Sequence, residues 1–117
     1  MRILLFLLAF LALPATAEVV TTASGGVLRA LDKISGDTVD IEIPAGGKAG
    51  VGSLEIVLVE CRYPAGNPSG NAYAALEISE TGRAGTLFSG WMIASAPALS
   101  AMEHPRYDVW VIRCITS

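Results

Sequence analysis

Three side chains suited to acid–base or metal chemistry lie within six residues near the end of this 117-residue chain: Glu103, His104 and Asp108. Imidazole and carboxylate groups are common ligands of transition metals. Glu103 and His104 are adjacent, however, and neighbouring side chains rarely converge on one ion. His104 is also the only histidine. We therefore expect no metal here, and a histidine whose hydrogen bonds are satisfied by a corner of the fold.

The same region permits a Ser-His-Asp arrangement that would use Ser95 or Ser100. No G-x-S-x-G pattern marks either serine as a nucleophile. The acidic residues are spread singly along the chain, so no pair of carboxylates for general acid–base catalysis stands out. The sequence thus assigns no catalytic residue and no cofactor. Hydrolysis through His104, with Glu103 or Asp108, is the less favoured alternative.

A structural role explains the same residues more economically. Trp91 and Trp110 alternate with other side chains on predicted strands, where a ring can be buried while its indole N–H finds a partner. Tyr107 begins the last predicted strand, where its hydroxyl can tie down the preceding corner. His104 and Asp108 are the expected polar pair of that corner. The candidate binding or corner residues are Trp91, Met92, Glu103, His104, Tyr107, Asp108 and Trp110.

The chain has two cysteines, Cys61 and Cys114. In a small exported domain such a pair most often forms a structural disulfide. The alternative, a redox or metal-binding pair, lacks a C-x-x-C spacing and further thiols. We predict a Cys61–Cys114 disulfide, with Trp91 or Trp110 covering it and the last strand held against a central one.

The first seventeen residues have the layout of a secretory signal peptide. Arg2 precedes an apolar run from Ile3 to Leu13, and Pro14 and small residues follow. The run is too short for the ~20 residues that span a bilayer. We predict a signal peptide at 1–17 cleaved after Ala17, a flexible segment at 18–26 and a single β domain at 27–117. The mature protein is expected in the periplasm, without stable membrane insertion.

Charge excludes one class of partner. The formal net charge is −3, and loss of Arg2 with the leader leaves seven cations against eleven acids, a charge of −4. An acidic domain without a basic cluster lacks the electrostatic surface that nucleic acid requires. We therefore expect no nucleic-acid partner.

Runs of β-branched and aromatic residues separated by turn residues predict strands along most of the chain. The segment 38–43 alternates, with Val39, Ile41 and Ile43 inward, after a tight hairpin turn at 35–37. The segment 53–62 is apolar on both faces in its middle, which predicts a central strand covered on each side. Residues 97–103 suggest one or two helical turns, with Ser95 as cap and Pro97 in the first turn. The fold class predicted is all-β, a small sandwich or partly open barrel of about six strands with one short helical corner.

Several short pieces of the sequence resemble one family. They are Leu31-Asp32-Lys33, Gly90-Trp91-Met92, Pro97-Ala98-Leu99 and Glu103-His104-Pro105. On these pieces the stretch from Val27 to Cys114 is similar to small exported proteins of alphaproteobacteria, classed only as a domain of unknown function, family 2155. The resemblance implies a compartment but no activity and no catalytic residue.

Three functional hypotheses remain. The leading one is a non-catalytic binding or structural module of the cell envelope. It would contact an envelope protein or a cell-wall component through a sheet edge or the corner at 96–103. The second is a small-ligand carrier with a pocket lined by Trp91, Met92 and Trp110. The third is the enzyme that uses His104.

Overall fold

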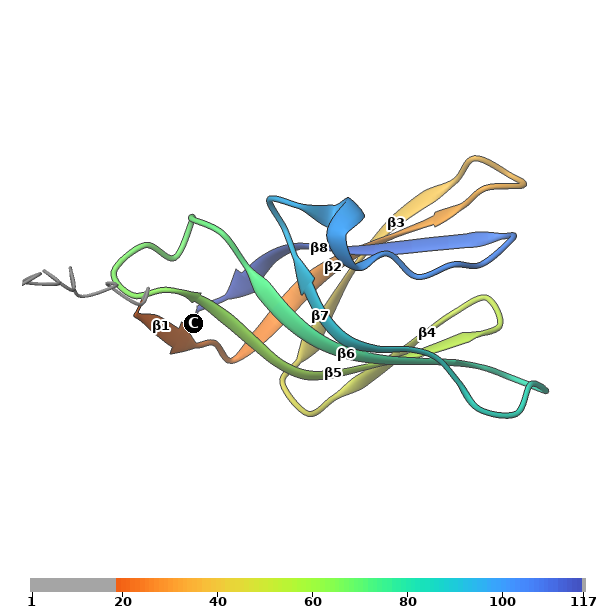
Figure 1. The fold of residues 1–117 in the computed structure, drawn as a ribbon, viewed down its shortest axis with the longest axis horizontal. Coiled ribbons are helices and arrows are strands. Elements are labelled where there is room, and N and C mark those ends of the chain that lie inside the picture. The colour runs from red at the N-terminus through yellow and green to blue at the C-terminus, as the bar shows by residue number, and fades with distance from the viewer. Residues whose placement is uncertain (1–18, 117) are drawn as a thin grey trace, which may run out of the picture.

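The computed structural model describes residues 19–116, which form two antiparallel sheets packed face to face (Figure 1). The larger sheet contains β1 (Val20–Thr22), β4 (Lys48–Val51), β5 (Leu54–Pro64), β6 (Tyr73–Glu80) and β7 (Thr86–Ile93). The smaller sheet has the order β3 (Thr38–Pro44), β2 (Gly25–Asp32), β8 (Tyr107–Ile115). One turn of 3₁₀ helix, η1 (Pro97–Ser100), lies between β7 and β8. The predicted all-β class is confirmed, and of the two architectures predicted the structure has the sandwich.

The sandwich has more strands than the sequence indicated, because β1 and β4 are only three and four residues long. Both pair with the same side of β5, one at each end. The segment predicted to be flexible is therefore partly ordered, since β1 forms within it and β2 already begins at Gly25. The expected signal peptide lies outside the described residues.

The hairpin of β2 and β3 follows the predicted pattern. Gly36, with φ of +80°, takes the left-handed conformation in its turn, and Asp32 Oδ1 accepts hydrogen bonds from the main-chain N–H groups of Ile34 and Ser35. Ile43 is fully buried as expected, but Val39 at the far end of β3 is exposed. The two sheets diverge towards that end (Figure 1), and Val39 stays 49% exposed.

The prediction that the apolar strand around Ile56 is central holds only within its sheet. β5 pairs with β6 on one side and with β1 and β4 on the other. Its outer face remains open, and Val59 is 47% exposed. The apolar run arises partly because Val59 is an additional residue in a β-bulge, where Leu58 pairs with Leu76 and Glu60 with Ala75.

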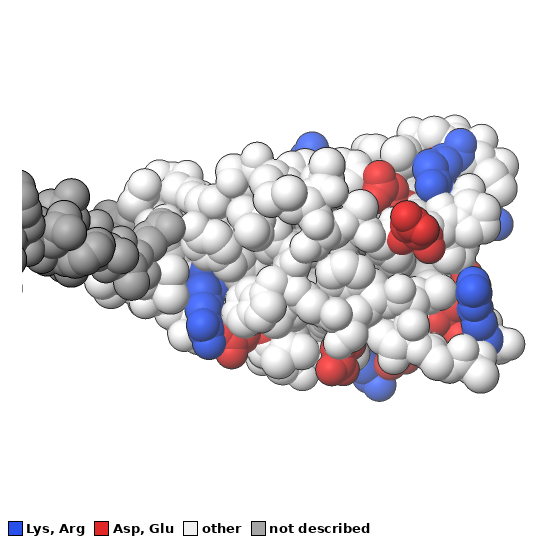
Figure 2. All heavy atoms as spheres, in the orientation of Figure 1, with Lys and Arg blue, Asp and Glu red and all other residues white. Residues whose placement is uncertain are grey.

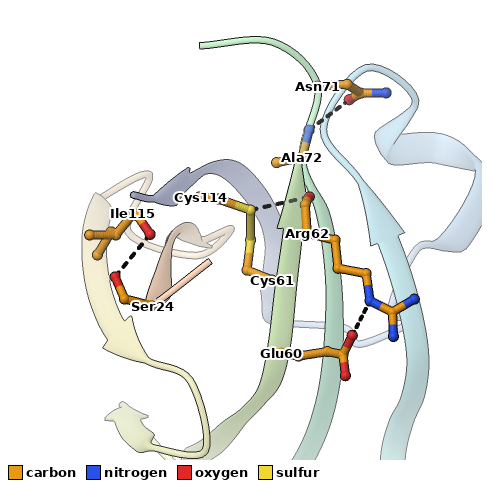
Figure 3. Close-up of a disulfide and its surroundings, with 8 residues drawn as sticks. All are labelled: Ser24, Glu60, Cys61, Arg62, Asn71, Ala72, Cys114 and Ile115. Atoms are coloured by element: carbon orange, nitrogen blue, oxygen red, sulfur yellow. Dashed lines mark hydrogen bonds and ion pairs between the residues drawn. A yellow bond between two sulfur atoms is a disulfide. The ribbon is translucent and has the colours of Figure 1, made fainter. Parts of the chain in front are cut away.

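Two bulges direct the cysteines into the core. Leu58 faces inward, and the bulge at Val59 shifts the alternation so that Cys61, three residues later, also faces inward. In β8 the unpaired residue is Ile112, and Cys114 follows the inward-facing Val111 in the same way. The structure contains the predicted disulfide, with the two Cα atoms 5.8 Å apart (Figure 3).

The disulfide joins the two sheets and holds the last strand, β8, against β5, as predicted. Neither tryptophan covers it. Its close neighbours are the main-chain oxygen of Arg62, 3.3 Å from the Cys114 sulfur, and Gly26 on β2. A Cβ atom at Gly26 would lie 3.3 Å from the Cys61 sulfur, so the bare backbone there lets the sheets approach closely.

The corner between β7 and β8 differs from its prediction in one contact. Pro97 opens η1 as expected, but Ala96 is the N-cap and no side chain caps the helix. Ser95 bonds instead with Asn71, which accepts from the Ser95 N–H and donates to its hydroxyl. Within residues 19–116 no helix is long and apolar enough to cross a membrane.

Removal of the disulfide should lower the free energy of unfolding strongly. Closure of a loop of 53 residues corresponds to about 4 kcal/mol in the chain-entropy model. We expect the double variant Cys61→Ala/Cys114→Ala to lose roughly 2–5 kcal/mol in urea denaturation. Wild-type protein under reducing conditions is the matched comparison and should show a similar loss. A loss below about 1 kcal/mol in both would contradict a stabilising bridge.

Candidate functional site

The structure separates the three residues proposed to line one ligand pocket. Trp91 lies on the outer face of the larger sheet, whereas its neighbour Met92 is buried between the sheets. Trp110 alternates with the buried Val109 and Val111 on β8, which places it on the outer face of the smaller sheet. Because these side chains point to three different places, the carrier pocket predicted from them does not exist.

His104 is held in the corner by both ring nitrogens. Its side chain is only 5% exposed, and Nε2 lies 2.8 Å from Oε2 of Glu80. Nδ1 accepts hydrogen bonds from the main-chain N–H groups of Arg106 and Tyr107, at 3.0 and 3.1 Å. Since Nδ1 faces two donors, the proton is assigned to Nε2, which donates to the carboxylate. The partner of His104 is thus Glu80, and the predicted pairing with Asp108 is wrong.

Glu80 also accepts a hydrogen bond from the hydroxyl of Ser53, at 3.0 Å. The carboxylate therefore stands between the serine and the histidine. In a nucleophilic triad the histidine is central, so that it can take the proton of the hydroxyl. Here both Ser53 and His104 donate to Glu80, an arrangement suited to holding strands together. Neither Ser53 nor Glu80 carried a signal in the sequence, because both lie far from His104 along the chain.

The other predicted corner residues surround this network. Lys33, Glu103, His104 and Asp108 line a shallow hollow of about 480 Å³, which Ala101, Met102 and Pro105 complete. Lys33 Nζ donates to the main-chain oxygen of His104 at 2.5 Å. The structure brings Glu103, His104 and Asp108 to one hollow, as their spacing suggested. Among the described residues no group of three or more Cys, His, Asp or Glu side chains is placed to hold a metal ion.

Further contacts attach the corner to both sheets. The ion pair between Arg106 and Asp32, at 3.0 Å, ties it to β2, while the bond from His104 to Glu80 ties it to β6. The buried ring of Tyr107 lies 5.3 Å from that of His104. Its hydroxyl lies against Gly52 at the turn between β4 and β5, where a Cβ atom would overlap it. Tyr107 therefore packs across to the larger sheet, beyond the adjacent corner assigned to it by the sequence.

The electrostatics of the corner favour ionised carboxylates. The hydrogen bond from His104 lowers the pKa of Glu80, and the bond from Ser53 lowers it further. The bond from Arg106 likewise lowers the pKa of Asp32. Both acids stabilise the fold most in their charged form, so their contribution is lost only as the solution becomes acidic.

A separate feature lies at the disulfide end, on the outer face of the larger sheet. Val20, Arg62, Tyr73, Trp91 and Ile93 line a groove of about 230 Å³. The strand register places Arg62 beside Tyr73 and Ile93 in one row, and Ala75 beside Trp91 in the next. Because Ala75 is small, the Arg62 side chain can cross β6 to reach Trp91.

The cation and the aromatic ring of this groove are in contact. The Arg62 guanidinium carbon lies 5.0 Å from the centre of the Trp91 ring, a cation–π contact. Arg62 Nε forms an ion pair with Glu60 (Figure 3). Trp91 nevertheless stays 41% exposed. The groove thus presents a held aromatic surface beside a charge-neutral Arg–Glu pair. The sequence had singled out Trp91 but not its partners.

The fold and these two sites define a disulfide-bridged β-sandwich. The chain belongs to the family described as "Uncharacterized protein conserved in bacteria (DUF2155)", whose sequence model matches residues 26–114. It is 30% identical over 94 residues to the uncharacterized protein RP359 of Rickettsia prowazekii (strain Madrid E). That match covers 78% of this chain and 61% of the relative, so the chain spans less than two thirds of the relative's length. No solved structure matches.

Replacement of Glu80 by glutamine should flatten the acid limb of the stability profile. A lowered pKa in the folded state means that the wild type loses stability as pH falls below the ordinary glutamate value of about 4.3. The variant should be less stable at pH 7 and lose less between pH 5 and 3. Urea denaturation across this range measures both, with Glu55→Gln on β5 as the control for loss of an exposed carboxylate. Parallel profiles for wild type and Glu80→Gln would contradict the corner network.

Gly52→Ala should destabilise the protein more than Gly82→Ala. Both glycines have positive φ, +54° and +80°, so alanine is strained at each by about 1 kcal/mol. Only at Gly52 does the new methyl group also overlap the Tyr107 hydroxyl, whereas the space around Gly82 is open. Thermal unfolding of the two variants should therefore separate clearly. Equal melting temperatures would show that Tyr107 does not pack closely at this turn.

Proposed function

We propose that this protein is a non-catalytic binding module of the bacterial cell envelope and that the groove around Trp91 is its binding surface. The observation that supports this most directly is the exposed Trp91 ring held by Arg62. Large aromatic rings held in place lose little entropy when they bind, which is why they often dominate recognition surfaces.

The proposed compartment is the periplasm. A disulfide across the two sheets is consistent with an oxidising environment, where such bonds persist. The predicted leader of residues 1–17 agrees with this location.

The corner around His104 supports a structural role over the alternative of catalysis. Nε2 bonds to Glu80 and Nδ1 accepts from two main-chain N–H groups, so the ring has no nitrogen left for a substrate in this arrangement. A general base must reach the proton that it abstracts. The groove, which lies at the opposite end of the sandwich, is therefore the better candidate.

We assign the ligand to cell-wall glycan, ahead of an envelope protein. The groove is shallow and lined largely by apolar groups, with an Arg–Glu pair of no net charge beside it. Sugar rings present C–H faces that stack on aromatic rings and hydroxyl groups that bond to charged planar side chains. A neutral groove on an acidic protein offers little attraction to an anionic ligand.

Cosedimentation with purified cell walls tests this function. The variant Trp91→Ala should lose at least about tenfold in affinity, equal to ~1.4 kcal/mol. The control, Trp110→Ala, removes the same ring from the opposite sheet and should bind like the wild type. In a Trp110→Phe background the fluorescence of Trp91 should change when soluble cell-wall fragments are added. Equal binding by both alanine variants, or an unchanged spectrum at saturating fragment, would overturn the proposal.

A further inference from the structure

One long stretch of the chain on a single side of the sandwich contains no charged residue. Residues 84–102 form the longest stretch of the chain without Asp, Glu, Lys, Arg or His. They build β7, η1 and the connections around them. Figure 2 shows this side, where acidic and basic side chains lie mainly around the margin of a largely uncharged area. We call β7 together with residues 94–102 the uncharged face.

The uncharged face includes a sheet edge without a strand partner. β7 is the last strand of its sheet and pairs only with β6 among the described residues. A strand of eight residues at an edge offers a row of main-chain donors and acceptors to another strand. The face also exposes apolar side chains, since Leu99 on η1 is 76% exposed and Trp91 stands at the edge itself.

The other sheet edges of the molecule are protected against such pairing. β3 presents Asp40 and Glu42 and ends at Pro44, all of which oppose the addition of a strand. β1 and β4 are too short to pair over a useful length. Pro97, Ala98 and Ala101 of the corner lie beside β8 at Val109 and Trp110. β7 is therefore the long edge that the sequence leaves without a charge.

We propose that this uncharged face binds a second copy of the chain, with the two β7 strands antiparallel about a two-fold axis. In such a contact every residue meets the same surface on the partner, so a charged face would repel itself. The protein is acidic overall, and the uncharged face is where two copies approach without that repulsion. The pairing joins the two larger sheets into one, and their outer faces lie on the same side.

The oligomeric state of the protein, purified after export with its own leader, tests this inference. Sedimentation equilibrium should give a dimer, and Leu99→Lys and Ser89→Lys should each raise the dimer dissociation constant at least tenfold. Both side chains are exposed on the uncharged face and outside the groove. Because a lysine lowers the net negative charge, a general charge effect would favour association instead.

The matched control is Val39→Lys, which adds the same charge at the exposed edge strand β3. It should leave the dissociation constant unchanged.

Hydrogen exchange adds a second readout, since the amides of β7 should be protected in a concentration-dependent way. If the wild type is still a monomer at about 100 µM, the proposal is overturned. The same holds if Val39→Lys weakens the dimer as much as Leu99→Lys and Ser89→Lys do. A monomer whose β7 crosslinks to another envelope protein would overturn it too, in favour of that partner. Cell-wall binding by the groove is measured separately with Trp91→Ala, so each proposal can fail without the other.

Discussion

The sandwich depends on a covalent bond between its two sheets at one end. The smaller sheet has three strands, and β3 buries only its residue Ile43 fully, so the contacts of this sheet with the core come mainly from β2 and β8. The disulfide between β5 and β8 fixes the sheets where they lie closest. The absence of a side chain at Gly26 makes room for the sulfur atoms. A domain of this size has a limited core, which is the situation in which a cross-link matters most.

At the other end the sheets diverge, and polar contacts take the place of the covalent bond. The corner before β8 is tied to β6 through His104 and Glu80, and to β2 through Arg106 and Asp32. Tyr107 packs from β8 onto Gly52 of the opposite sheet. The imidazole of His104 lies between two main-chain donors and a carboxylate, so both of its ring nitrogens have partners, and this makes its burial tolerable. The residues whose types pointed to acid–base or metal chemistry in the sequence thus stabilise the fold.

On the face shown in Figure 2, charged and uncharged side chains occupy different areas. Charged side chains lie around the margin and at the diverging end, while the uncharged face and the groove around Trp91 meet along β7. Arg62, the cation nearest the groove, is neutralised by Glu60. An exposed aromatic ring and an open strand edge are both costly to leave free in solution, and here they lie on one strand.

The sequence by itself determined the class of fold, the positions of the long strands and the pairing of the cysteines, because these follow from local alternation, turn residues and a count of two. It also marked the region of Trp91 and His104 as unusual. Only the tertiary structure decided which face each tryptophan occupies, since alternation along a strand does not show which of its two faces another sheet covers. It likewise decided that His104 bonds to Glu80 and that Arg62 reaches Trp91. These contacts join residues from different strands, and their distance in space depends on sheet register and packing, which no short stretch of sequence specifies.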